Sequence, residues 1–193
     1  MNLAYDSTTK RKELVRAAKE LFHQKGFPRT TLAKVARRAG VPLGNVHYYF
    51  PSKRSLAEAV VEAHLVELRS SFAAWERTSP PSDRLRLLVR APLGAPDSVI
   101  QFGCPHGSLC QELQKDEDSV LTKAGAGLLE AWVEWAQQQF EACGRKALEA
   151  RDLAEQLVAS IQGTMLMARV LGSRDLLALQ LSRLETWLGV ELS

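Results

Sequence analysis

The chain reads TTLAKVARRAGVPLGNVHYYFPSK from Thr30 to Lys53. The first half of this stretch spaces its apolar residues at i, i+3, i+4 and i+7, at Leu32, Val35, Ala36 and Ala39. That period predicts a short amphipathic helix with one buried face, which Thr31 would cap. Gly40 then supplies a left-handed turn, and Pro42 starts a second helix where its missing N–H costs little. Two short helices joined by such a turn indicate a helix-turn-helix.

The second of these helices is predicted to have an inner and an outer face. Val46 and either Tyr49 or Phe50 lie three or four residues apart, so we expect them to face the core. The outward positions are then Gly44, Asn45, His47 and Tyr48. Backbone can approach a groove closely at a glycine, and amide, imidazole and phenol groups can bond to bases or phosphates. This face therefore suits DNA.

Pro51 ends that helix, and Ser52 is expected to cap the next one, which begins with Lys53 and Arg54. Cations in a first turn oppose the helix dipole, which makes them a poor choice for stability alone. Phosphate binding accounts for them better, because Lys53 and the N–H groups of the helix start would hold the anion together. The alternative is that exposed basic residues cost little there.

The composition is that of an ordinary globular protein, with 193 residues, 46% hydrophobic and 24% charged. No apolar run approaches the roughly 20 residues of a membrane span, and no N-terminal apolar block resembles a signal peptide. The three cysteines are an odd number, which argues against a disulfide framework. We therefore expect a cytoplasmic protein with no membrane partner.

Charge is divided unevenly along the chain. Residues 1–60 carry 12 Lys and Arg against 4 Asp and Glu, whereas residues 61–193 carry 13 against 18. A basic N-terminal third beside an acidic remainder is typical of a nucleic-acid-binding head attached to a body with another role. A solvated charged face is the alternative explanation.

The rest of the sequence predicts helices and no strand. Apolar residues recur at helical spacing in six further segments, at 52–76, 83–93, 104–115, 116–143, 149–171 and 174–188. Residues 94–97 are expected to form a loop, and residues 98–103 are ambiguous. With a first helix that ends at Gly26, nine helices are expected in all. The fold class is therefore all-α.

Motifs of catalysis and metal binding are absent from the sequence. It has no P-loop, no Gly-x-Ser-x-Gly, no zincin motif and none of the Glu-x-x-His pairs of di-iron bundles. The spacing between Cys104 and Cys110 does not match a zinc knuckle. We expect no enzyme activity, no cofactor and no metal.

Residues Thr31–Val41 and Val46–Lys53 resemble the DNA-binding segment of TetR/AcrR-family transcriptional regulators. The likeness covers about the first 60 residues, with the turn, the aromatic run and the terminal lysine in register. It implies a nine-helix TetR-like architecture, with a three-helix helix-turn-helix head and a six-helix regulatory and dimerisation body. We accordingly expect a DNA-binding domain at residues 1–53 and a ligand-binding and dimerisation domain at residues 54–193.

The resemblance also implies roles for single residues. Thr31 and Lys53 would hold phosphates, Asn45, His47 and Tyr48 would read bases or flanking phosphates, and Tyr49 would pack or touch the DNA backbone. Leu43 stands where the family often has a polar residue, and would meet a thymine methyl. The expected DNA-binding set is Thr31, Leu43, Gly44, Asn45, His47, Tyr48, Tyr49 and Lys53.

In the body, the resemblance implies a ligand pocket and a dimer interface formed by the last two helices. The expected effector-binding residues are Phe102, Cys104, His106, Trp132, Trp135, Gln162 and Met165. The expected dimer-interface residues are Leu157, Ile161, Leu177, Leu181, Leu184 and Trp187. For the aromatic and Met residues, plain core packing is the alternative.

These features together predict a ligand-responsive, DNA-binding transcriptional regulator. It would act as a homodimeric repressor that a small molecule releases from a palindromic double-stranded operator. One alternative is a thiol-based redox or electrophile sensor, if Cys104 has a depressed pKa. Another is a helical ligand-binding or interaction protein that no longer reads DNA, because Pro42 and Leu43 both depart from the residues usual in the family.

Overall fold

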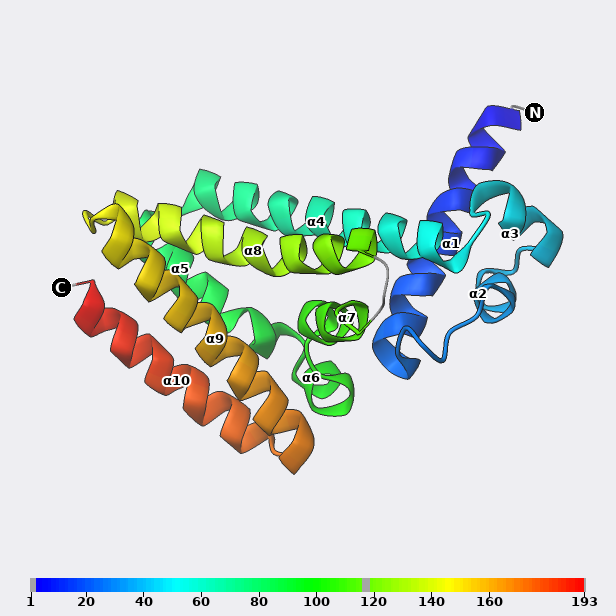
Figure 1. Ribbon diagram of the computed structural model, residues 1–193. Helices are drawn as coiled ribbons and strands as arrows, with labels where there is room; N and C mark the ends of the chain where they lie inside the picture. The colour runs from blue at the N-terminus through cyan, green and yellow to red at the C-terminus, as the bar shows by residue number, and fades with distance from the viewer. Residues whose placement is uncertain (1–2, 116–118, 193) are drawn as a thin grey trace. The chain divides into compact units, whose positions relative to one another are not determined.

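A computed structural model describes residues 3–115 and 119–192 of the chain. Those residues form α-helices and one short 3₁₀ helix with no β-strand among them, so the all-α prediction is confirmed (Figure 1). In chain order the elements are α1 (Leu3–Lys25), α2 (Leu32–Ala39), α3 (Leu43–Tyr49), α4 (Lys53–Thr78), α5 (Pro81–Arg90), η1 (Ala91–Gly94), α6 (Pro96–Phe102), α7 (Pro105–Leu113), α8 (Ser119–Ala142), α9 (Ala147–Leu171) and α10 (Arg174–Glu191).

Each helix expected from the sequence has a counterpart, and the ambiguous segment adds α6. Residues 94–97 were expected to form a loop, but they end η1 and begin α6. Pro96 lies in the first turn of α6, where its missing N–H removes no helical hydrogen bond. Residues 116–118, which were expected to start a helix, lie outside the described residues.

The chain divides into two compact units. Unit 1 comprises Met1–Val66 and Ser108–Leu128, and unit 2 comprises Glu67–Gly107 and Leu129–Ser193. Three helices, α4, α7 and α8, therefore contribute residues to both units. The boundary after residue 53 concerns which residues bind DNA, and it stays a prediction.

The core of unit 1 forms where α1 packs against α2 and α2 against α3. The apolar stripe of α1 is buried, as its spacing predicts, at Leu14, Ala17, Ala18, Leu21 and Phe22. Val35 of α2 and Val46 of α3 are both 0% exposed. Of the two candidates for the inner end of α3, Phe50 is buried at 2% exposure and Tyr49 is only half-buried. These side chains fix α3 to the rest of unit 1.

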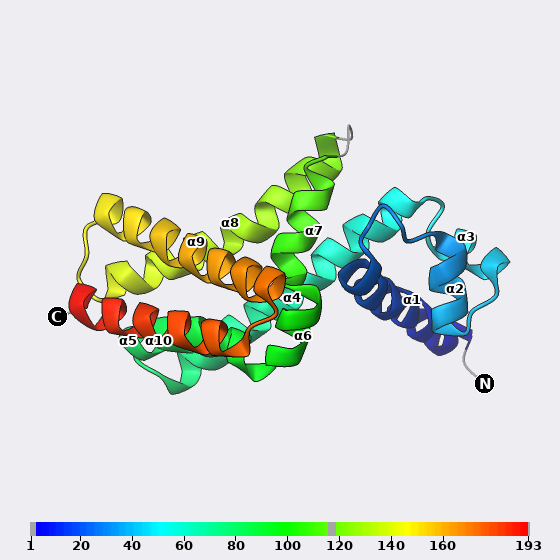
Figure 2. The ribbon, with the colours of Figure 1, turned by 90° about the horizontal axis from the view of Figure 1, so that it is seen from below.

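In unit 2, α9 and α10 run antiparallel and side by side, and α10 also packs against α5 and α6 (Figures 1 and 2). The connection between them is tight, because Gly172 takes a φ of 61°. Ser173 then caps α10 by accepting a hydrogen bond from the Leu176 N–H at 3.1 Å. The turn at Gly172 and the Ser173 cap thus reverse the chain, so that α10 packs along α9.

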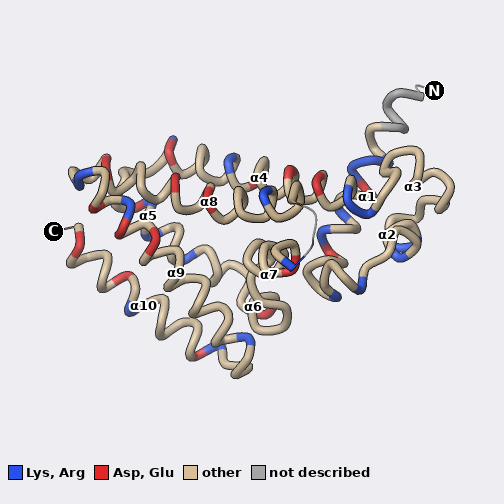
Figure 3. Tube along the Cα trace, in the orientation of Figure 1, with Lys and Arg blue, Asp and Glu red and all other residues tan. Residues whose placement is uncertain are grey.

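Lys and Arg residues are frequent along α1 and α2 in unit 1 (Figure 3). This is the part of the chain in which the sequence has its excess of Lys and Arg. Within residues 3–115 and 119–192, none of the helices combines the length and the apolar character needed to cross a bilayer.

Replacing the buried ring that anchors the end of α3 should destabilise the protein. Phe50→Ala is expected to lower the free energy of unfolding by about 3–5 kcal/mol, because it leaves a cavity in the core of unit 1. Urea unfolding followed by circular dichroism measures this at one fixed protein concentration. Tyr48→Ala is the matched control, because it removes a ring that is 81% exposed nearby, and it should cost less than about 1 kcal/mol. Equal losses would contradict the assignment of Phe50 to the core.

Candidate nucleic-acid interface

Local hydrogen bonds build the turn between α2 and α3. Thr31 Oγ1 accepts a hydrogen bond from the Lys34 N–H at 3.3 Å and so caps α2, as predicted. At the other end Gly40 takes a left-handed φ of 66°, and the Val41 N–H donates to the Ala36 C=O at 3.0 Å. A left-handed glycine commonly closes a helix in this way. The turn fixes the direction in which α3 leaves α2.

The face of α3 that was predicted to point outward does so. Tyr48 is 81% exposed and Leu43 is 44% exposed. The other exposed positions of the predicted set are Gly44, Asn45 and His47. The half-buried Tyr49 meets Tyr48 edge to face, with ring centroids 5.1 Å apart. An amide, an imidazole and a phenol on one exposed helix can hydrogen-bond to base edges or phosphates.

Lys53, at the start of α4, lies against the segment that connects α1 to α2. Its Nζ donates to the Pro28 C=O at 3.2 Å and lies 4.1 Å from the centroid of the Phe27 ring. Ser52 caps α4 as predicted, because its Oγ accepts from the Ser55 N–H at 3.1 Å. Thr31 follows Pro28 by three residues. Of the two predicted phosphate-binding residues, Lys53 thus contacts the segment that connects α1 to α2, and Thr31 belongs to it.

Glu112 of α7, which the sequence did not single out, holds that same segment in unit 1. Its Oε2 accepts a hydrogen bond from the Phe27 N–H at 2.6 Å. Gly26 permits the approach, because its φ is 85° and a Cβ there would lie 2.5 Å from Glu112 Oε1. The two partners are 85 residues apart in sequence. No local pattern marks such a contact, and the glycine is equally well explained as the end of α1.

The residues predicted to line an effector pocket all belong to unit 2. They are Phe102, Cys104, His106, Trp132, Trp135, Gln162 and Met165. Cys104, Trp135 and Met165 are buried, at 9%, 5% and 6% exposure, and the other four are half-buried. Gln162 packs against Gly107 of α7, where a Cβ would collide with its side-chain oxygen. The set mixes core positions with positions that a ligand can reach.

Three of these residues meet in an aromatic cluster. Trp132 Nε1 donates to His106 Nδ1 at 3.1 Å, and Trp135 Nε1 donates to Glu76 Oε1 at 2.7 Å. The ring of Phe72 is stacked on Trp135 with centroids 4.1 Å apart, and meets Trp132 edge to face at 6.0 Å. Both indole N–H groups therefore have acceptors, which Trp needs when it is removed from water.

Five of the six residues predicted for a dimer interface lie in the core of unit 2. Leu157, Ile161, Leu177, Leu181 and Leu184 are 0–8% exposed, and Trp187 is half-buried. The five have almost no area left to bury against a second chain, so they hold α9 and α10 to their own unit instead. The exposed large apolar residues of these helices are Leu148, Leu166, Met167, Val170, Leu171, Leu179 and Val190, at 49–85% exposure.

The three cysteines are free thiols, and two of them make side-chain hydrogen bonds. Cys104 Sγ accepts from the Gly107 N–H at 3.3 Å, and Cys110 Sγ donates to the Gly125 C=O at 3.0 Å. Burial raises the pKa of the Cys143 thiol, which disfavours the reactive thiolate. This geometry adds no support to a thiol sensor. Across the described part of the chain, no group of three or more His, Cys, Asp or Glu is placed to hold a metal ion.

Two family models match the chain. The model for bacterial regulatory proteins of the tetR family matches residues 14–60, which include α2, α3 and the start of α4. The model for the C-terminal domain of LmrA/YxaF-like transcriptional regulators matches residues 94–180. The match to the first model covers the turn and the exposed face of α3.

Curated relatives and solved structures agree with these models. The transcriptional regulator AcuR of Cereibacter sphaeroides is 29% identical over 175 residues, which are 86% of this chain and 80% of AcuR. The transcriptional repressor DhaR of a Mycobacterium species is 26% identical over 175 residues, 87% of this chain and 86% of DhaR. A crystal structure of regulatory protein TetR from Rhodobacter sphaeroides is 26% identical and superposes with a TM-score of 0.78, covering 91% of this chain and 96% of that one.

Removing the Glu112 carboxylate should loosen the segment between α1 and α2. Glu112→Ala leaves the Phe27 N–H without its acceptor, so it is expected to lower the free energy of unfolding by about 1–3 kcal/mol. The Phe27 amide should also exchange its hydrogen faster, which nuclear magnetic resonance can follow. Glu58→Ala is the control, because Glu58 forms an exposed i,i+4 pair with Arg54 on α4 and should cost no more than about 0.5 kcal/mol. An unchanged exchange rate of the Phe27 amide would show that Glu112 does not hold this segment.

Proposed function

Because the chain belongs to the TetR family of transcriptional regulators, we propose that it is a homodimeric repressor that a small molecule releases from its operator. As a family member it is a DNA-binding regulator and not an enzyme. The exposed face of α3, fixed by the Gly40 turn, carries the DNA-binding part of the proposal. A protein with this role acts where the chromosome is, in the cytoplasm.

In this proposal the reading and clamping roles are divided. The α3 side chains Leu43, Asn45, His47 and Tyr48 enter the major groove, and Gly44 lets the backbone approach it. Thr31 and Lys53 hold phosphates at the edge of the groove, with Tyr49 packing beneath or touching the DNA backbone. The packing of Lys53 on Phe27 and Pro28 supports this, because it limits the conformations of a long side chain before DNA arrives.

A second copy of the chain is the proposed partner for α9 and α10. Leu166, Met167, Val170 and Leu171 recur at i, i+1, i+4 and i+5 of α9, so they form one exposed apolar stripe. On α10 the exposed Leu179 and Val190 continue this apolar character. Contiguous apolar surface of this kind marks an interface, and twofold symmetry is the commonest way to bury it. Two heads would then reach half-sites about 34–36 Å apart.

The aromatic cluster of unit 2 is the proposed place for an effector. His106, Trp132 and Gln162 are half-buried, and so combine apolar surface with polar atoms that can orient a ligand. The ligand would have to bind the DNA-free state more tightly than the DNA-bound state, because only differential affinity shifts an equilibrium. Phe102, Cys104, Trp135 and Met165 would contribute apolar walls.

The DNA-binding part can be tested by fluorescence polarisation with the DNA upstream of the gene and a scrambled duplex of equal length. Tyr48→Ala and Asn45→Ala should weaken specific binding by about 5- to 150-fold, since a good base contact is worth about 1–3 kcal/mol. Lys53→Ala should weaken binding to both duplexes and reduce the salt slope by about 1. Arg77→Ala, an exposed charge at the other end of α4, is the control and should change neither. Wild-type protein that binds both duplexes equally would refute specific recognition.

Dimerisation can be tested separately by placing a charge in the apolar stripe of α9. Val170→Glu, at a position 73% exposed in one chain, should halve the mass measured by analytical ultracentrifugation and weaken operator binding. Circular dichroism should show an unchanged helix content, because the side chain is not part of the core. Leu148→Glu is the matched control, at an 85% exposed position near the other end of α9. If Val170→Glu stays dimeric, the interface lies elsewhere.

A further inference from the structure

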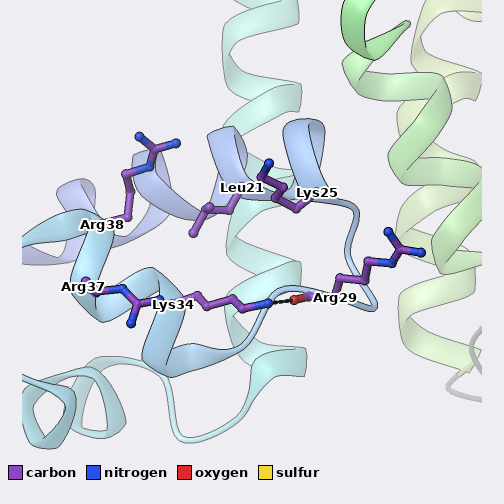
Figure 4. A pocket seen from close by; sticks show the side chains of 6 residues that line it. All are labelled: Leu21, Lys25, Arg29, Lys34, Arg37 and Arg38. Atoms are coloured by element: carbon purple, nitrogen blue, oxygen red, sulfur yellow. Dashed lines mark hydrogen bonds between the residues drawn. The ribbon is translucent and has the colours of Figure 1, made fainter.

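A hollow of about 470 Å³ lies in unit 1 between α1, α2 and the segment that connects them (Figure 4). Its lining residues are Leu21, Lys25, Arg29, Lys34, Arg37 and Arg38. Leu21 and Lys25 of α1 lie across the hollow from Lys34 and Arg37 of α2. Five of the six are cations, and none of the described residues that line the hollow is acidic.

Only some of these cations have hydrogen-bond or ion-pair partners within the described part of the chain. Lys34 Nζ donates to the Arg29 C=O at 2.7 Å. Arg38 donates to Gln24 at 2.9 Å and lies 3.7 Å from Glu20, so a carboxylate partly offsets it. For Lys25, Arg29 and Arg37, no carboxylate of the described residues lies within ion-pair distance. The guanidinium groups of Arg29 and Arg38 point away from one another (Figure 4). An anion bound in the hollow would lower the repulsion among the cations that line it.

The chemistry of the lining favours phosphate as that anion. A guanidinium presents a planar fork of N–H donors that matches two phosphate oxygens, and ammonium groups add point charges. Leu21 contributes apolar surface to the lining. A hollow of 470 Å³ exceeds the roughly 30 Å³ share of one water many times. A hydrated phosphate group therefore fits.

The connecting segment points to DNA as the source of the phosphate. Arg29 of the hollow directly follows Pro28, whose C=O accepts the Lys53 hydrogen bond, and precedes Thr31 by two residues. The hollow thus adjoins both proposed phosphate clamps within unit 1. None of the α3 residues lines it. A phosphate held here would therefore lie outside the base pairs that α3 reads.

We propose that this hollow binds a backbone phosphate of duplex DNA beyond the bases contacted by α3. The inference rests on the DNA-binding function proposed above. In this proposal Lys25, Arg29 and Arg37 raise the affinity for DNA of any sequence, because phosphate contacts do not read bases directly. The bound phosphate would extend the protected DNA past the segment that α3 covers.

The test measures DNA affinity against salt concentration for Lys25→Gln, Arg29→Gln and Arg37→Gln. Because the three side chains would share one phosphate, each variant should reduce the slope of log K against log salt by up to about 0.9, and should lower affinity for the upstream and scrambled duplexes by the same factor. Ethylation interference should show flanking phosphates whose modification weakens wild-type binding but has no effect on Arg37→Gln. Lys123→Gln removes the same charge from an exposed position of α8 in unit 1 and should match wild type.

Two outcomes would overturn the proposal. One is a set of variants whose salt slopes equal that of wild type. The other is calorimetric binding of free pyrophosphate that Arg37→Gln abolishes while its DNA affinity stays unchanged, which would assign the hollow to a small phosphate compound. If wild type fails to distinguish the upstream from the scrambled duplex, specific operator recognition fails. In that case, the salt slopes measured on the scrambled duplex still test whether the hollow binds a DNA phosphate.

Discussion

The course of the segment that connects α1 to α2 depends on Phe27. Its N–H donates to the Glu112 carboxylate of α7 at 2.6 Å, its ring lies 4.1 Å from the ammonium of Lys53 on α4, and the same ring meets Phe22 of α1 at 5.3 Å. Three helices thus constrain one residue of a connecting segment. A hydrogen bond to an ionised acceptor is stronger than a neutral one, so the segment leading to Thr31 has a defined course although it lacks helical hydrogen bonds of its own.

Sequence reasoning succeeded where the deciding interactions are local. The Thr31 cap, the left-handed Gly40 and the inward Val46 each depend on residues within a few positions, so spacing and turn chemistry are enough to predict them. Whether Tyr49 or Phe50 faces the core could not be predicted in the same way, because it depends on packing against other helices. The Glu112 contact joins residues 85 apart in sequence, and no local pattern marks it. The basic hollow lies in the part of the chain whose excess of Lys and Arg the sequence shows, but the sequence does not show its concave shape.

The interface prediction shows a different limit. On α9 and α10 both the inner and the outer positions are apolar, because Leu157 and Ile161 pack within unit 2 while Leu166 and Val170 remain exposed. Hydrophobic periodicity detects apolar character but cannot tell which chain buries it. The exposed apolar residues near the end of α9 are the ones that the proposed function assigns to contact with a second copy of the chain.

On the proposed function, the same contacts bear on how much free energy a ligand would need in order to act on DNA binding. α7 carries His106, which bonds to Trp132 in unit 2, and six residues later Glu112, which holds Phe27 in unit 1. On the proposed function, a ligand that displaces the His106–Trp132 pair acts on the helix that also positions the segment under Lys53. Coupling free energies between sites are typically about 1–3 kcal/mol. Leaving a buried N–H without its acceptor costs about the same amount. The loss of one hydrogen bond at Phe27 would therefore be large enough to change operator affinity by roughly 5- to 150-fold, without any need to unfold the head.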